Sequence, residues 1–401
     1  MRFLKRLVLD ATVAWVRMLR RWRTGKGLLY VVPPASAGSL GDQALLTGLA
    51  ALLPASYPNR ICQVLLPGWQ EISVRGMEAD ALPVSLSVKG LTNFVWRLLD
   101  CRHFGILGAD VMDGRYSPDL VQAFVTLCNL GARCGVPTTI FGFSFSGTPD
   151  PKAVAALSNL DSRVTCLCRD PVSRQRFEQR TGNRAQLVAD LAFRMDAHLD
   201  TTSTHAAAEW IGQQRATGRR VVGLNVNVLP TSGETARTIA AYAGELTALL
   251  RSFPDLVCVM LPHDLRKGQS DHVSLVSVRN AVPQDLHERI HVLDPPFSAW
   301  DVKGVAALAD LIVTGRMHLA IAALAQGVPA IGIAYQGKFE GLYAYFGMQE
   351  LLLDPDSVAT PGLLAGRIRT AFERVDDYRQ RIATALPQVL HLSAQNTAHL
   401  T

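Results

Sequence analysis

The chain has 401 residues, of which 48% are hydrophobic and 18% are charged, and its formal net charge is +6. At roughly 150 residues per domain, this predicts two or three globular domains and excludes a disordered chain or a small disulfide scaffold. No window holds the roughly 18 uninterrupted apolar residues that a membrane-spanning helix needs. The seven cysteines form no C-x-x-C pair, which argues against a zinc ribbon and favours a reducing cytoplasm.

The positive charge belongs to one segment. Residues 1–26 hold eight Lys or Arg side chains against a single Asp, so the rest of the chain is almost neutral and offers no basic field for nucleic acid. At about 100° per residue the segment forms an amphipathic helix. Its apolar side comprises Leu4, Leu7, Val8, Ala11, Trp15, Met18, Leu19 and Trp22. Two interpretations stay open: residues 1–24 lie in an anionic membrane surface, or the helix docks on its own domain.

From Gly27 onward, short β-rich runs alternate with helical patterns, which is typical of parallel sheets with crossover helices. The first set of predicted strands covers 28–33, 61–66, 83–88, 104–111, 137–143, 164–169 and 186–190. The second set covers 220–228, 256–262, 290–294, 311–315 and 329–335. Between the two sets, the polar stretch 196–208 is the predicted domain boundary.

The expected fold is α/β, with a basic amphipathic helix over 1–26 and two Rossmann-like domains over 27–197 and 205–401. The tail after Thr360 is expected to be helical. Ligands of such folds bind beyond the carboxyl ends of the strands, so residues at the strand ends are the candidates for function.

Candidate residues follow three strands of the first half. Gly41 and Asp42 close a loop of small residues that leads into a helix, where free N–H groups suit an anion or a sugar hydroxyl; alternatively, Asp42 only caps the helix. Asp113 could orient or deprotonate a sugar hydroxyl, although Asp-Gly is also ordinary turn chemistry. Arg169 presents a planar guanidinium that suits two-oxygen anions, with a structural pair to Asp170 as the alternative.

The strongest pattern lies in the second half. Arg316 leaves a predicted strand, His318 lies in the first turn of the next helix, and Lys338 follows the next strand. Three cationic or protonable groups would then meet at the positive end of a helix dipole. Their mutual repulsion would be costly without a bound anion, so the pattern predicts an anion site.

At these residues the sequence resembles the polysaccharide pyruvyl transferase family, whose members transfer pyruvate from phosphoenolpyruvate onto sugar hydroxyls as a ketal. The family pattern of Arg-x-His, Gly-x-Pro, Tyr-x-x-Lys and a closing Gly reads here as Arg316-Met317-His318, Gly327-Val328-Pro329, Tyr335-Gln336-Gly337-Lys338 and Gly347. The resemblance also covers Gly41-Asp42, Arg169-Asp170 with Ser173, Asp190 to Phe193, and Pro262-His263, so it spans about 27–350.

The resemblance implies a fold similar to that of the two-domain GT-B glycosyltransferases, with the acceptor on the 27–197 side and the donor on the 205–401 side. It implies that His318 is the catalytic acid and that no metal or redox cofactor is needed. The implied substrate-binding residues are Arg169, Arg316, Lys338, Gly41, Asp42 and His263.

The implied enzyme is cytoplasmic, or peripheral on the inner face of the cell membrane. It uses phosphoenolpyruvate and a lipid-linked or nucleotide-linked saccharide destined for a cell-surface polysaccharide. One departure concerns the acceptor side: many relatives carry a run of glycines where this chain has Gly108-Ala109-Asp110 and Asp113-Gly114. A GT-B glycosyltransferase using a nucleotide sugar, or a non-catalytic member of a biosynthetic complex, remains the alternative.

Overall fold

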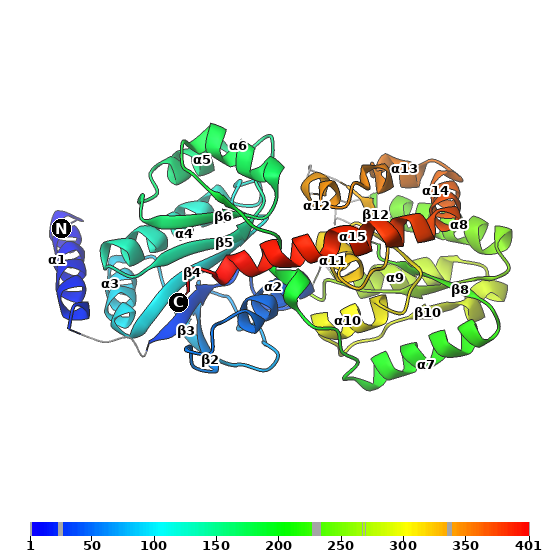
Figure 1. The fold of residues 1–401 in the computed structure, drawn as a ribbon, viewed down its shortest axis with the longest axis horizontal. Helices are drawn as coiled ribbons and strands as arrows, with labels where there is room; N and C mark the ends of the chain where they lie inside the picture. Colours follow the sequence, from blue (N-terminus) through cyan, green and yellow to red (C-terminus); the bar gives the residue numbers. More distant parts are fainter. Residues whose placement is uncertain are drawn as a thin grey trace. The chain divides into compact units, whose positions relative to one another are not determined.

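The computed structural model describes residues 2–22, 27–226, 234–266, 268, 270–334 and 339–400, without the side chains of residues 2–5 and 234. The chain forms two compact units, each with its own parallel sheet (Figure 1). The first comprises Met1–Ala37, Leu45–Arg194 and His391–Thr401; the second comprises Gly38–Ala44 and Met195–Leu390. The predicted α/β fold with two Rossmann-like halves is therefore confirmed.

The first sheet has the strand order β3-β2-β1-β4-β5-β6-β7, and every neighbouring pair is parallel. Its strands are β1 Leu28–Val32, β2 Arg60–Leu65, β3 Glu78–Pro83, β4 Cys101–Ala109, β5 Thr138–Phe143, β6 Val164–Cys168 and β7 Gln186–Leu187. The helices of this part of the chain are α1 Arg2–Arg20, α2 Leu40–Ala51, α3 Val88–Arg97, α4 Pro118–Arg133, α5 Pro151–Ser158 and α6 Pro171–Thr181. The order in which successive strands are added to the sheet reverses between β1 and β4. Rossmann-type folds bind ligands at such a point.

Both faces of this sheet are buried, as its nearly uninterrupted apolar strands require. Tyr30 and Val32 of β1 face a core that includes side chains of α3 to α6. The alternate residues Leu29 and Val31 face a second core with α2 and with Leu400 near the end of the chain. The seven cysteines of the chain are all buried and unbonded, so they act as small apolar side chains in these cores and in the second unit.

The second sheet repeats the topology in the order β10-β9-β8-β11-β12-β13, again all parallel. Its strands are β8 Arg220–Leu224, β9 Leu256–Met260, β10 Ile290–Val292, β11 Leu311–Thr314, β12 Ala330–Ile333 and β13 Leu352–Leu353. The helices are α7 Thr202–Ala216, α8 Glu234–Ser252, α9 Asp271–Ala281, α10 Ala299–Ala306, α11 Met317–Leu324, α12 Glu340–Ala344, α13 Asp356–Ala359, α14 Leu363–Glu373 and α15 Val375–Ala394. Here the order reverses between β8 and β11.

The N-terminal helix α1 packs on the first unit, chiefly along α3. It docks through Thr12, Val13 and Val16, all buried, and Arg20 donates from one nitrogen to the carbonyl oxygens of Leu98 and Cys101, both at 2.6 Å. Within the part of the chain that the structure describes, no helix is both long and apolar enough to cross a membrane. Docking on the chain's own domain, one of the two open interpretations, is therefore confirmed for this side of the helix.

One predicted strand is wrong. Residues 83–88 were expected to be extended, whereas the strand is β3 Glu78–Pro83 and a helix begins at Val88. Ser87 determines the helix start, because its hydroxyl accepts a hydrogen bond from the Gly90 N–H at 3.1 Å.

The two units differ from the predicted domain ranges at three segments, of which the shortest is 195–197, predicted in the first domain and found in the second unit. Residues 391–401, predicted in the second domain, pack with the first unit: Asn396 donates to the carbonyl of Ala189 at 2.9 Å, and Thr397 to that of Leu52 at 3.1 Å. Conversely, Gly38–Ala44 packs with the second unit.

Candidate functional site

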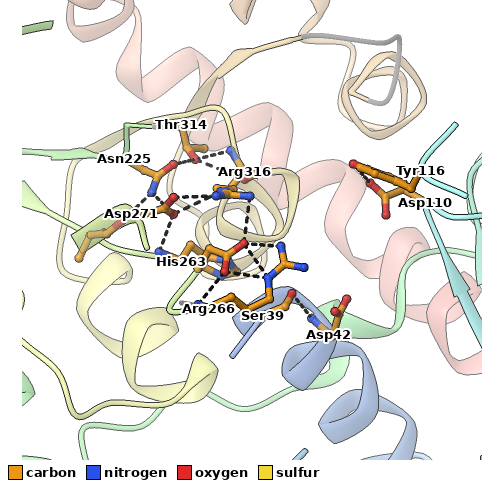
Figure 2. Close-up of polar contacts among 12 residues, drawn as sticks. Ser39, Asp42, Asp110, Tyr116, Asn225, His263, Arg266, Asp271, Thr314 and Arg316 are labelled. Atoms are coloured by element: carbon orange, nitrogen blue, oxygen red, sulfur yellow. Dashed lines mark hydrogen bonds and ion pairs between the residues drawn. The ribbon is translucent and has the colours of Figure 1, made fainter. Parts of the chain in front are cut away.

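The carboxyl edge of the second sheet gathers polar side chains from three strands, as Figure 2 shows. Asn225 follows β8, His263 follows β9, and Thr314 ends β11 immediately before Gly315 and Arg316. The Thr314 hydroxyl accepts from the Arg316 N–H at 2.8 Å and lies 3.3 Å from the Asn225 side-chain oxygen. These groups therefore meet at the β8/β11 reversal of strand order, the position at which this topology binds ligands.

Asp271, the first residue of α9, joins these strand ends. Its carboxylate is buried and accepts hydrogen bonds from the Asn225 amide (3.0 Å), the His263 backbone N–H (3.0 Å) and the Arg316 guanidinium (2.7 and 3.2 Å). A buried carboxylate is stable only with such partners. Asp271 therefore fixes the direction of Arg316.

A second carboxylate, Asp264, lies between two arginines. Its Oδ2 is 3.3 Å from the Arg316 guanidinium and 2.5 Å from that of Arg266. Two buried carboxylates thus balance two arginines. The charge of Arg316 is therefore already balanced, and the positive end of α11 adds a further attraction for an anion. The anion site predicted from Arg316, His318 and Lys338 stays a prediction.

His318 lies in the first turn of α11 and is partly exposed. A Cβ atom at Gly41 would come within 2.3 Å of its Nδ1, so the imidazole packs directly on the start of α2. The preceding residues are tied to the same edge, because the Leu265 N–H donates to the Gly38 carbonyl at 2.8 Å. The structure thus brings Gly41, Arg316 and His318 together.

Asp42 is nearly buried in the first turn of α2. The Ser39 hydroxyl accepts from the Asp42 N–H at 3.3 Å and so caps the start of this helix. The capping role considered for Asp42 stays a prediction.

His263 is buried beneath the edge. Burial, followed by the positive charges of His318 and Arg316, holds the pKa of His263 well below its usual range. His263 therefore stays neutral near pH 7, and it donates its backbone N–H to Asp271.

In the first unit, Arg169 follows β6, and its side chain is only 3% exposed. It donates to Asp190 at 2.8 Å and to the Ser144 hydroxyl at 2.7 Å. Asp170 instead caps α6 by accepting from the backbone N–H and the hydroxyl of Ser173 at 2.7 and 2.6 Å. The structural partner of Arg169 is therefore Asp190, not Asp170.

The end of β4 carries two carboxylates in different settings. Asp113 is buried, and its Oδ1 accepts from the Arg115 N–H at 3.1 Å within a turn. Asp110 is partly exposed and accepts from the Tyr116 hydroxyl at 3.1 Å (Figure 2). Ala109, the last residue of β4, has φ +44°, a left-handed conformation that costs a non-glycine residue energy.

Lys338, the remaining predicted cation, lies outside the described residues. Sequence reasoning did not single out Asn225, Asp264, Arg266 and Asp271, and of the two carboxylates after the predicted strand 104–111 it chose Asp113 rather than Asp110. Asn225 directly follows an apolar run, which is the signal that could have identified it. Among the residues described, no group of three or more His, Cys, Asp or Glu is arranged to hold a metal ion.

The fold matches solved structures of sugar-nucleotide enzymes. A UDP-GlcNAc 2-epimerase from Neisseria meningitidis bound to UDP-GlcNAc aligns with a TM-score of 0.54 and 12% identity, over 89% of this chain and 94% of that one. A UGT transferase from Siraitia grosvenorii in complex with UDP gives 0.54 and 12%, over 94% and 99%. A UDP-forming α,α-trehalose-phosphate synthase from Burkholderia vietnamiensis gives 0.51 and 11%, over 93% and 97%. At these identities the similarity shows the GT-B type of fold.

At the level of sequence, no curated protein matches the chain significantly. The family model described as polysaccharide pyruvyl transferase matches residues 106–337, more than half of the chain. The matched range includes the end of β4, Arg169, the Asp264 and Asp271 carboxylates, and the Arg316-Met317-His318 turn. The chain therefore belongs to the polysaccharide pyruvyl transferase family.

Proposed function

We propose that this protein is a ketal pyruvyl transferase that moves pyruvate from phosphoenolpyruvate onto hydroxyls of a saccharide used in cell-surface polysaccharide biosynthesis. In this proposal it acts in the cytoplasm or peripherally on the inner face of the cell membrane, with the donor on the second unit. The observation that carries the proposal is the partly exposed His318 in the first turn of α11, packed on Gly41. Family membership supplies the reaction class.

The chemistry needs an acid beside an anion site. In the proposed reaction, His318 protonates the methylene carbon of the enol phosphate, which creates a cationic centre at C2. One sugar hydroxyl attacks this centre, and a second attack by a neighbouring hydroxyl expels phosphate and closes the ketal. A positioned acid contributes typically about 100- to 10,000-fold to such a step.

Phosphoenolpyruvate is an anion, so its site needs hydrogen-bond donors that are already in place before it binds. Arg316 is held by Asp271 at 2.7 Å and by Asp264 at 3.3 Å, so little reorganisation is needed when an oxyanion binds. The N-terminal N–H groups of α11 add a positive partial charge. We assign Arg316, His318 and Lys338 to the phosphate and carboxylate of the donor; Gly41, Asp42 and His263 complete that side.

Two further proposals concern the first unit. Arg169 remains a proposed residue for the phosphate or carboxylate of phosphoenolpyruvate, although an oxyanion would have to share its guanidinium with Asp190. The acceptor base proposed from the sequence is Asp113, but burial within a turn favours Asp110, whose carboxylate is partly exposed and held by Tyr116.

The direct test incubates the purified chain with phosphoenolpyruvate and lipid-linked or nucleotide-linked saccharides, and measures phosphate release and the mass gain of a pyruvyl ketal. His318→Ala should abolish turnover while the circular dichroism spectrum stays unchanged. His272→Ala, an imidazole that bonds Asp294 at 2.7 Å elsewhere on α9, is the matched control and should retain activity. Unchanged turnover in His318→Ala would remove the assigned role.

The second candidate is a glycosyltransferase that uses a nucleotide sugar. It is favoured by the fold similarity to structures holding UDP or UDP-GlcNAc. Ligand-induced stabilisation separates the two, because only a ligand that binds the native state raises the melting temperature. Phosphoenolpyruvate should raise it for a pyruvyl transferase and UDP for a glycosyltransferase. A chain inert to every donor would point to a non-catalytic member of a biosynthetic complex.

A further inference from the structure

The N-terminal helix has a second apolar side that no described residue of its own unit covers. Opposite the docked residues Thr12, Val13 and Val16, a stripe of large apolar side chains is exposed on α1 and the turn that follows it: Leu7, Val8, Trp15, Met18 and Trp22. We call this stripe the outer face of α1. At about 100° per residue, its members fall within an arc of about 100°.

Exposed large hydrophobic side chains are concentrated on this face. Ten large hydrophobic side chains are exposed among the described residues, and five of them belong to the outer face of α1. Trp22 is 84% exposed and Trp15 is 57% exposed. Single exposed apolar residues need no explanation, but a contiguous stripe marks a contact surface.

A basic groove borders the same helix. It has a volume of about 460 Å³ and is lined mainly by Arg17, Arg21, Arg133, Arg163 and Asp10. Arg133 pairs with Asp10, and Arg163 with Asp161, both at 2.6 Å. Arg17 and Arg21 form no ion pair with any described residue, so the groove retains positive charge next to the outer face.

This combination identifies the partner by its chemistry. A second copy of this chain would have to supply negative charge for Arg17 and Arg21, yet the body of the chain outside residues 1–26 is almost neutral. An anionic lipid surface offers phosphates for the arginines, a headgroup layer suited to Trp, and acyl chains for Leu, Val and Met.

We propose that the outer face of α1 lies in the interface of an anionic phospholipid bilayer, with Trp15 and Trp22 among the headgroups and Arg17 and Arg21 on lipid phosphates. The buried side of the helix fastens the rest of the first unit to that surface. This binding goes beyond the proposed reaction and does not depend on it.

Vesicle co-sedimentation of the full chain tests the proposal. Vesicles of phosphatidylcholine mixed with phosphatidylglycerol should bind the protein, and phosphatidylcholine alone should not. Trp15→Gln with Trp22→Gln should abolish binding. Arg17→Gln with Arg21→Gln should weaken it roughly 30-fold, because each basic group near the surface adds on the order of 1 kcal/mol. High salt should also weaken binding of the unaltered chain to the anionic vesicles.

Matched controls remove equivalent groups elsewhere. Val273→Gln with Leu363→Gln, both exposed in the second unit, and Arg180→Gln with Arg251→Gln should bind as the unaltered chain does. Turnover of a water-soluble acceptor should be the same in all these variants, which separates failure of this proposal from failure of the proposed function. Equal binding to neutral vesicles, or undiminished binding by the tryptophan variant, overturns the proposal. So does a dimer in sedimentation velocity that the tryptophan variant dissociates without any vesicle binding.

Discussion

The position of His318 depends on the absence of a side chain at residue 41. A Cβ atom there would lie 2.3 Å from the imidazole Nδ1, far inside van der Waals contact. We expect Gly41→Ala to displace the imidazole and to lower the rate of phosphate release by at least 100-fold, since a proton donor must be placed within hydrogen-bonding distance.

The control for this variant is Gly212→Ala, because Gly212 lies on exposed α7 with nothing within 4 Å of a new Cβ. That variant should keep full activity and gain about 1 kcal/mol of helix stability. Normal turnover by Gly41→Ala would show that His318 tolerates the displacement or is not the acid.

One buried imidazole, that of His103, makes the stability of the first unit sensitive to acid. His103 and His399 lie 2.9 and 2.7 Å from the Thr139 hydroxyl. Burial, with a smaller contribution from His399, lowers the pKa of His103 to about 3. In the unfolded chain the His103 imidazole therefore binds a proton near pH 6.5, whereas in the folded chain it stays neutral at that pH.

Since the folded-state pKa is the lower one, stability should fall as the pH drops from about 6.5 towards 3, by at most about 1.4 kcal/mol per pH unit for His103. Thermal melts from pH 7 to pH 4 check this. His103→Gln should flatten the dependence, while the exposed His205→Gln should not. The same slope in both variants would assign the acid sensitivity to other groups.

Charge pairing was the part of the site that the sequence concealed. Arg316 and His318 were recognisable because they closely follow an apolar run. The partners of Arg316, Asp264 and Asp271, lie some fifty residues earlier, in a loop and at a helix start. Periodicity reports which residues share an element, but not which carboxylate meets a distant guanidinium. The balance of charge therefore required the folded chain.

At the scale of elements, Asp271 makes α9 part of the site. Its carboxylate accepts hydrogen bonds from groups that follow β8, β9 and β11. In Asp271→Asn, the new amide N–H group would face these hydrogen-bond donors. The free energy of unfolding, measured in urea, should therefore fall by about 2–3 kcal/mol. Asp376→Asn removes a carboxylate that is 92% exposed and should cost less than about 0.5 kcal/mol. Similar losses in the two variants would contradict the central role of Asp271.

Strands were predictable where apolar runs are buried on both sides, as in β4, β5 and β9. β3 was missed because it is an edge strand with exposed and half-buried residues, and Glu78 there pairs with Arg60 of β2. The alternation of Val84 and Leu86 with serines imitated a strand, but Ser87 begins a helix.

At the scale of the molecule, the last eleven residues stabilise the unit in which the chain begins. Ser393 and Asn396 are buried and donate to the carbonyl oxygens of Asp190 and Ala189 at 2.8 and 2.9 Å, and Leu400 is part of a core with Leu29. Truncation after Leu390 should therefore raise amide hydrogen exchange in β4, β5 and residues 188–194.

The second unit is the internal reference for that experiment. Exchange in β9 and β11 should be unchanged, because no residue after Leu390 belongs to that unit. Uniform exchange increases in both sheets, or none in β4 and β5, would contradict the assignment of His391–Thr401 to the first unit. The sequence predicted helix for this segment correctly, but a helical pattern does not report the body on which it packs.

The grouping of Gly38–Ala44 and His391–Thr401 also governs how the protein can be dissected. The polypeptide passes from one unit to the other four times, after Ala37, Ala44, Arg194 and Leu390. A single cut by a protease therefore cannot release a complete unit, because each unit is built from separate segments of the chain. The same holds when only one half of the gene is expressed. Fragments divided at Arg194 should become folded and soluble only when they are produced together, as complementary halves.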